Sequence, residues 1–149
     1  MELDSKVTNL TTTNLNYKVM EAKDLMIGDW VHYIGDDCTN DVNIRVREIH
    51  EDFVYSTFAA DEFYYNELEP IPLTPEILEK SGFVNVENTQ TSTIMYSFRD
   101  SLFRIEVYNF NHITIDSYYT DSSCDIFVSS VHEFQHALRL CKIEKEIIL

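Results

Sequence analysis

Apolar residues in the first half of the chain follow the two-residue period of β-strands. Alternating runs, rich in β-branched and aromatic residues, occur at 30–34, 42–49, 53–58 and 63–65, and turn-forming or polar residues separate them. Side chains two positions apart share one face of a strand, so each run predicts a short, half-buried strand. Several short strands at this spacing predict a small antiparallel, barrel-like unit.

The pattern then changes to that of a helix. Thr74 can cap a helix, Pro75 suits the first helical position, and Glu76 sits well at the positive end of the helix dipole. Gly82 follows about two turns later and predicts the end of the helix. A short helix is therefore expected between Thr74 and Gly82.

Strands return after this helix, and the chain closes on a second helix. Residues 93–98, 102–108 and 112–118 show alternation or a β-branched and aromatic bias, and the breaks between them are short enough for hairpin turns. They predict a three-stranded antiparallel meander with one covered side. Apolar residues with the helical period predict the final helix, over about 131–145, as part of that cover.

Taken together, the elements predict an α+β fold in three parts. Residues 1–22 form a polar lead-in, and residues 23–73 form a small antiparallel barrel-like unit of the SH3-like kind. Residues 74–149 form an α+β subdomain of a short helix, the three-stranded meander and the C-terminal helix. Such a prediction concerns shape alone, because small barrels host many unrelated functions.

The chain is strongly acidic, with a net charge of 11 − 26 = −15. A surface of this charge repels nucleic-acid phosphates and anionic lipids, so neither direct nucleic-acid binding nor membrane binding is expected. Between Arg47 and Lys80 there is no lysine or arginine, whereas nine acidic residues fall there. This stretch is either a solvated face or a mimic of a nucleic-acid backbone that binds a basic protein.

Cysteine usage indicates a reduced compartment. Cys38, Cys124 and Cys141 are odd in number and form no C-x-x-C pair, which is typical of ordinary cytoplasmic thiols. Cys141 lies on the apolar stripe of the final helix and is expected to be an inert core residue. No segment resembles a signal peptide or approaches the ~20 apolar residues that span a bilayer, so a cytoplasmic location is expected.

The stretch from Ser130 to Leu138 contains the pattern H-E-x-x-H, as His132, Glu133 and His136. Two histidines one helical turn apart can hold zinc, and the glutamate between them can activate water. One hypothesis is therefore a zinc-dependent peptidase, with the two histidines as ligands and Glu133 as the general base.

Three observations favour a structural interpretation of this pattern. The histidines fall opposite the apolar stripe and beside Arg139, which predicts solvated, outward-facing histidines and disfavours a bound dication. Ser130 and Glu133 fit a capping box, in which the Glu133 carboxylate binds the amide of Ser130 without any metal. Only 13 residues follow His136, so a downstream third ligand is missing. We therefore assign no catalytic, cofactor-binding or metal-ligating residue and expect no cofactor.

Three blocks, 25–31 (L-M-I-G-D-W-V), 70–83 (P-I-P-L-T-P-E-I-L-E-K-S-G-F) and 131–135 (V-H-E-F-Q), occur in this order. In these blocks the chain resembles a family of short uncharacterised proteins from gut Bacteroidetes (Bacteroides) and their phages or mobile elements, over most of residues 23–140. The family typically has asparagine at the position of His136, which implies that the second zinc ligand is not part of the family pattern. The resemblance implies a phage or mobile-element setting, and no activity.

The leading hypothesis is a non-enzymatic cytoplasmic protein that acts through protein–protein contacts. Two alternatives stay open: the zinc-dependent peptidase, and an acidic decoy that binds a basic nucleic-acid-binding protein. The sequence does not indicate an oligomeric state.

Overall fold

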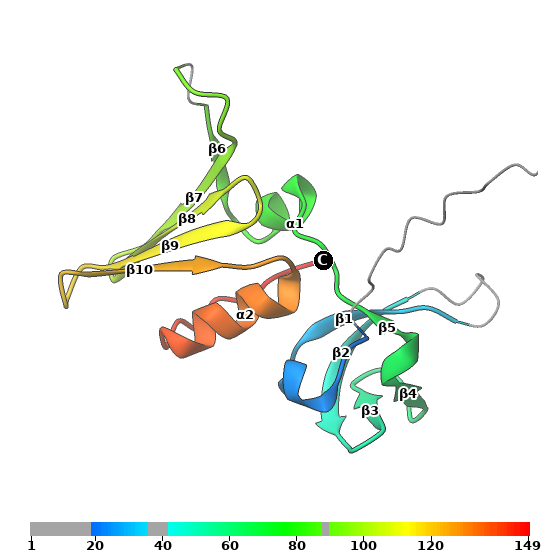
Figure 1. Ribbon diagram of the computed structural model, residues 1–149. Coiled ribbons are helices and arrows are strands. Elements are labelled where there is room, and N and C mark those ends of the chain that lie inside the picture. Colours follow the sequence, from blue (N-terminus) through cyan, green and yellow to red (C-terminus); the bar gives the residue numbers. More distant parts are fainter. Residues whose placement is uncertain (1–18, 36–41, 88–89) are drawn as a thin grey trace, which may run out of the picture.

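The structure is a computed structural model that describes residues 19–35, 42–87 and 90–149. These residues form two antiparallel β-sheets and two α-helices (Figure 1), which confirms the predicted α+β class. Of the predicted lead-in over residues 1–22, the first 18 residues lie outside the described part.

The first sheet is a curled, barrel-like sheet with the strand order β4-β3-β2-β1-β5. Its strands are β1 (Trp30–Tyr33), β2 (Val42–Ile49), β3 (Phe53–Ser56), β4 (Glu62–Tyr64) and β5 (Leu68–Glu69). The 3-10 turns η1 (Ala22–Asp24) and η2 (Tyr65–Glu67) precede β1 and β5, respectively. Alternate residues of the strands, such as Val31, Ile44 and Val54, face the inside and are fully or almost fully buried.

The second sheet has the strand order β10-β9-β8-β7-β6, and every neighbouring pair is antiparallel. Its strands are β6 (Val84–Val86), β7 (Met95–Arg99), β8 (Phe103–Tyr108), β9 (His112–Ser117) and β10 (Ser122–Phe127). The predicted meander corresponds to β7, β8 and β9. The prediction of only three strands was wrong, because β6 and β10 extend the sheet on both sides.

Both missed strands lie at the edges of the sheet. Most β10 side chains are exposed, so the strand buries little apolar surface beyond Ile126, and its residues, S-S-C-D-I-F, show no clear alternation. β6 has three residues, of which two are exposed. An edge strand pairs through its backbone with one neighbour and buries little side-chain surface. Its sequence pattern is therefore weak.

Helix α1 (Pro75–Lys80) begins and ends where the sequence predicts. The Thr74 hydroxyl accepts from the Ile77 amide at 3.3 Å, and Pro75 occupies the first helical position. Gly82 has a φ of +85°, and the Phe83 amide donates to the Leu78 carbonyl at 2.9 Å. This is the left-handed glycine cap expected after the helix.

Helix α2 (Val131–Leu140) is shorter than predicted. Lys142 adopts a φ of +55°, its amide donates to the Arg139 carbonyl, and the Ile143 amide donates to the Leu138 carbonyl. This is the same type of cap, but lysine takes the place that glycine usually has, so no glycine marks the end of this helix along the chain. Ile143 and Ile147 beyond the helix are still buried, which accounts for the longer apolar pattern.

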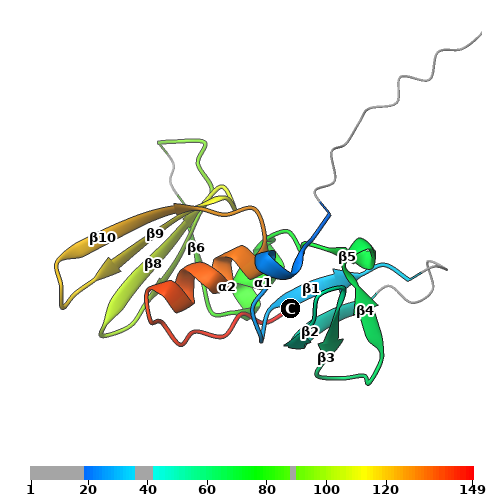
Figure 2. The ribbon, with the colours of Figure 1, turned by 60° about the horizontal axis from the view of Figure 1, so that its bottom comes forward.

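Helix α2 lies between the two sheets (Figures 1 and 2). Its apolar side, with Phe134 and Leu138, packs into a core that it shares with α1 and the second sheet. A separate apolar cluster fills the first sheet. Trp30 belongs to β1 but packs against the core of the second sheet, so the two sheets meet at β1 and α2.

Candidate functional site

The H-E-x-x-H stretch forms the first turns of α2. The Ser130 hydroxyl accepts from the Glu133 amide at 3.4 Å, as the capping box predicts. The Glu133 carboxylate, however, accepts from the amide and the hydroxyl of Ser129, at 2.5 and 2.8 Å. The predicted bond to the Ser130 amide was therefore wrong by one residue, although Glu133 still caps the helix start.

The prediction that both histidines face the solvent was also wrong. His132 is only 6% exposed, and its Nδ1 lies 3.0 Å from the Ser130 hydroxyl. His136 is partly buried, and its Nε2 lies 2.6 Å from Asp29 Oδ2. The helical projection correctly placed both residues opposite the apolar stripe, but the first sheet covers that side.

Asp29 is the centre of the contact between α2 and the first sheet. Its carboxylate is fully buried, and Oδ2 accepts from the Met26 amide at 2.7 Å in addition to its contact with His136. Arg139 Nη1 donates to Oδ1 at 2.6 Å. A buried carboxylate needs such partners, and Arg139, one turn after His136, supplies the compensating charge.

The side-chain amide of Gln135 binds backbone groups beside this cluster. Its Oε1 accepts from the Trp30 amide at 2.9 Å, and its Nε2 donates to the Gly28 carbonyl at 3.2 Å. Gly28 has a φ of +91°, and a Cβ at this position would lie 3.2 Å from the Arg139 guanidinium. The Gly-Asp-Trp turn thus fits closely against α2.

The motif residues His132, Glu133 and His136 line a pocket of about 320 Å³ together with Lys23 and Asp24 of the segment before β1. Zinc-binding histidines present a ring nitrogen to the metal, whereas Asp29 engages the Nε2 of His136. Within residues 19–35, 42–87 and 90–149, no group of three or more histidine, cysteine, aspartate or glutamate side chains is placed to hold a metal ion. The contacts of these residues are those of a helix docked on a strand.

Burial of His132 has a consequence for stability at acid pH. Desolvation holds the pKa of His132 below its ordinary value of 6.5, although Asp29 and Glu133 partly offset the effect. Below that pH the unfolded chain binds a proton that the folded protein resists, so the unfolded state binds more protons and the free energy of unfolding falls. Stability from this group is present above about pH 6.5 and is lost as the pH drops toward the folded-state pKa.

We therefore expect the His132→Asn variant to lose less stability than the wild type between about pH 7 and pH 5. Asparagine can still reach Ser130 but does not titrate. Urea unfolding at several pH values measures the slope, and His50→Asn at an exposed position controls for the loss of one histidine. Parallel pH profiles for the His132 variant and the wild type would contradict this assignment.

A second candidate site is the outer face of β2, β3 and β4. Glu48, Tyr55 and Glu62 are direct cross-strand neighbours in one row, and Phe53 and Tyr64 form the next row. We call these five residues and His50, which stacks on Phe53 with a ring separation of 4.8 Å, the acidic aromatic face. The centroid of the Phe53 ring lies 5.3 Å from that of the Tyr55 ring and 5.8 Å from that of the Tyr64 ring.

Glu62 is held between two tyrosines on this face. The Tyr64 hydroxyl donates to its Oε2 at 2.7 Å, and the Tyr55 hydroxyl donates to its Oε1 at 3.4 Å. The bond to Glu62 raises the pKa of Tyr64, and desolvation followed by the charge of Glu62 raises that of Tyr55. Both tyrosines therefore stay neutral donors and keep the Glu62 carboxylate in a defined position.

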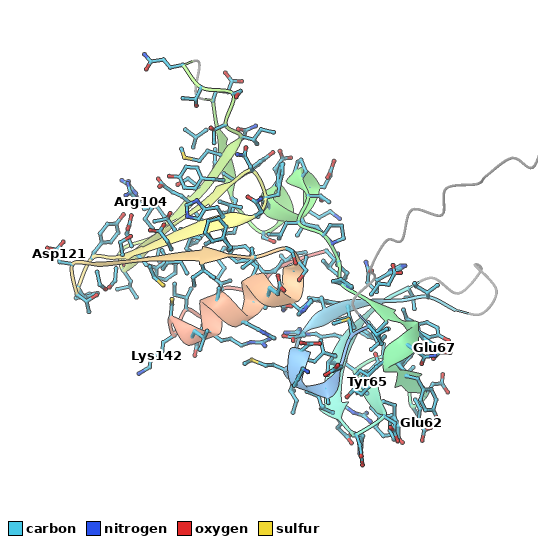
Figure 3. All side chains as sticks on the ribbon, in the orientation of Figure 1. Glu62, Tyr65, Glu67, Arg104, Asp121 and Lys142 are labelled. Atoms are coloured by element: carbon cyan, nitrogen blue, oxygen red, sulfur yellow. The ribbon has the colours of Figure 1, made fainter. Side chains whose placement is uncertain are left out.

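The surroundings of this face are negative. Glu62 and Glu67 lie near Tyr65 at one end of the first sheet (Figure 3), and Glu51 and Asp52 occupy the β2–β3 turn. The nearby Arg47 guanidinium pairs with Glu48 at 3.1 Å and lies 5.7 Å from the Tyr55 ring centre. The sequence indicated the acidic stretch but not the aromatic rows, which appear once the cross-strand register is known.

No family model, curated protein or solved structure matches this chain. In the described part of the chain, no helix has both the length and the apolar character needed to cross a membrane.

Proposed function

We propose that this protein acts by binding a basic protein partner through the acidic aromatic face. The observation that carries the proposal is the row Glu48–Tyr55–Glu62, in which a carboxylate lies on each side of an aromatic ring. The net charge of −15 would attract such a partner over a long range and speed the encounter.

The chemistry of the face matches arginine and lysine side chains. A guanidinium can bind a carboxylate through two parallel hydrogen bonds and can stack on an aromatic ring. Arg47 already pairs with the Glu48 carboxylate through its Nε and lies over the Tyr55 ring. Tyrosine and phenylalanine also offer large contact areas with few rotatable bonds, so ordering them on binding costs little entropy.

Binding of an oligo-arginine peptide tests this proposal. Glu48→Gln/Glu62→Gln should weaken binding about tenfold or more, because each carboxylate lost removes a charge-assisted contact of roughly 1 kcal/mol. The matched control, Asp121→Asn/Glu144→Gln, changes the net charge equally at two exposed positions outside the face. Fluorescence anisotropy at low and physiological salt gives both affinities and their salt dependence.

Two results would contradict the proposal. Equal weakening by the control variant would mean that net charge alone attracts the peptide. Salt-independent binding would mean that the carboxylates do not contribute. A further variant, Tyr64→Ala, removes an exposed ring and should weaken oligo-arginine binding more than oligo-lysine binding, because the planar guanidinium stacks better.

The SH3-like fold, the cytoplasmic location and the phage or mobile-element setting expected from the sequence belong to the same proposal. The SH3-like classification is supported by a four-strand meander followed by a 3-10 turn and by a fifth strand that pairs with β1. A cytoplasmic location and a phage or mobile-element setting are supported by composition and by the family resemblance. If the partner is a nucleic-acid-binding protein, added DNA should compete with the acidic aromatic face for it.

The zinc-dependent peptidase is a separate hypothesis with a separate test. Metal analysis of untagged protein should find less than about a tenth of an equivalent of zinc if His136 serves to dock α2 on Asp29. Stoichiometric zinc that is lost in His136→Ala would instead favour the peptidase.

A further inference from the structure

Two cysteines from distant parts of the sequence meet beside the second sheet. Cys124 lies in β10 opposite Ile115, and because Ile115 is buried in the core, the Cys124 side chain lies on the helix-covered face. Cys141 is the C-cap residue of α2. Both side chains line one pocket of about 340 Å³.

Both backbone positions are fixed by regular structure. The continuous register of β9 and β10, from Ser122 to Phe127, places Cys124. The cap after α2 places Cys141, through its amide bond to the Ala137 carbonyl at 3.2 Å and the left-handed turn at Lys142. Figure 3 shows Lys142 beyond the end of α2 and Asp121 at the turn that leads into β10. The fold itself therefore brings both cysteines to the same pocket.

We propose that Cys124 and Cys141 form a dithiol site that is oxidised to a disulfide by exchange with small-molecule disulfides. Cys124 is exposed, because β10 is an edge strand, whereas Cys141 is partly buried. This arrangement suits a pair in which the exposed thiol reacts first and its neighbour completes the exchange. The expectation that Cys141 is an inert core residue is thereby revised.

The exchange with glutathione disulfide proceeds in two balanced steps. The Cys124 thiolate attacks one sulfur of the disulfide, a mixed disulfide forms, and one glutathione thiolate leaves. Cys141 then gives up its proton to solvent and attacks the Cys124 sulfur, and the second glutathione leaves. Two protein thiols are oxidised to one disulfide, and one glutathione disulfide is reduced to two glutathione molecules.

Accessibility and acidity both assign the first step to Cys124. Burial raises the pKa of the Cys141 thiol, so Cys141 is a poor first nucleophile in free solution. Once Cys124 carries glutathione, Cys141 is held next to the sulfur that it must attack. Such proximity makes the second step intramolecular and faster than attack by a second glutathione.

The new bond would fasten the edge strand to the end of α2. A disulfide between Cys124 and Cys141 would close the loop between these two residues, which restricts the unfolded chain and so stabilises the fold. For a chain of this length, a rise in melting temperature of about 5 to 10 °C is expected. Arg139 is two residues before Cys141, so the bond would also hold the helix end that contacts Asp29.

The test uses the full chain with Cys38→Ser, equilibrated in glutathione buffers from reducing to oxidising. Trypsin cuts after Arg104, Arg139 and Lys142, so the expected disulfide joins peptide 105–139 to peptide 140–142. Mass spectrometry without reductant should detect this linked pair and no stable glutathione adduct. The melting temperature should rise on oxidation and return after reduction.

Variants that lack one of the two cysteines test the role of each thiol. Cys141→Ser should accumulate glutathione on Cys124, because the resolving thiol is absent, and Cys124→Ser should stay largely unmodified. A persistent glutathione adduct in the parent protein, or thiols that stay reduced in the most oxidising buffer, would overturn the proposal. So would a disulfide that forms only between two chains, which gel filtration without reductant would reveal.

Discussion

Replacing Asp29 by alanine should lower the free energy of unfolding by about 3 kcal/mol and the melting temperature by roughly 6 to 12 °C. Asp29 is fully buried and accepts from Met26, while contacting His136 and Arg139. Its loss leaves these partners without their acceptor at the contact between α2 and β1. Because Arg139 is 35% exposed and regains water, the expected cost stays below that of a fully buried ion pair.

Two further variants separate charge from packing. Asp29→Asn keeps an acceptor for the Met26 amide and should cost less than alanine, while Asp125→Ala on the exposed strand β10 should change stability by less than about 0.5 kcal/mol. In a double-mutant cycle, Asp29→Ala and Arg139→Ala should be coupled by more than about 1 kcal/mol. Additive effects would mean that the ion pair contributes nothing beyond its separate members.

Local signals in the sequence were sufficient for α1. Thr74, Pro75 and Gly82 act within one or two turns of the chain, and the structure has each in its predicted place. The apolar stripe of α2 was equally reliable, because Phe134 and Leu138 are buried as the helical period requires. These features depend on neighbours that are close in sequence.

The contacts of the opposite side of α2 could not be predicted from one helix. Asp29 is 107 residues from His136 and 110 from Arg139, and nothing in the local pattern relates them. The sequence of α2 nevertheless contains a signal for this contact. Gln135, His136 and Arg139 give α2 a side with hydrogen-bonding groups that are less strongly hydrated than lysine or glutamate, which suits a half-buried contact. A turn with an aspartate between Gly28 and Trp30 is then a reasonable partner.

The acidic aromatic face shows a different limit of sequence reasoning. The nine acidic residues after Arg47 were visible in the sequence, but the function of a charged stretch depends on which side chains share a surface. The β2–β3 register shifts between Val46 and Glu48, and this irregularity decides that Glu48 pairs with Tyr55. A one-residue error in register would place the carboxylate on the opposite face of the sheet.

Replacing Phe134 by alanine should have an effect as large as that of Asp29, and it tests whether the two sheets unfold together. Phe134 is completely buried, and its ring centre lies 5.8 Å from that of Phe83 in the core of the second sheet. Removing the ring should cost about 3 to 5 kcal/mol. Phe127→Ala is the matched control, because Phe127 is 79% exposed and should cost less than about 0.5 kcal/mol.

The unique tryptophan makes this variant informative about both sheets. Trp30 belongs to β1 yet packs against the core that contains Phe134. If α2 holds the sheets together through Asp29 and Gln135, losing Phe134 must loosen the strand in which Trp30 lies. Denaturant midpoints from Trp30 fluorescence and far-ultraviolet circular dichroism should then fall together. Separate midpoints would mean that each sheet unfolds on its own, and the contacts of His136 and Arg139 would then add little to the stability of either.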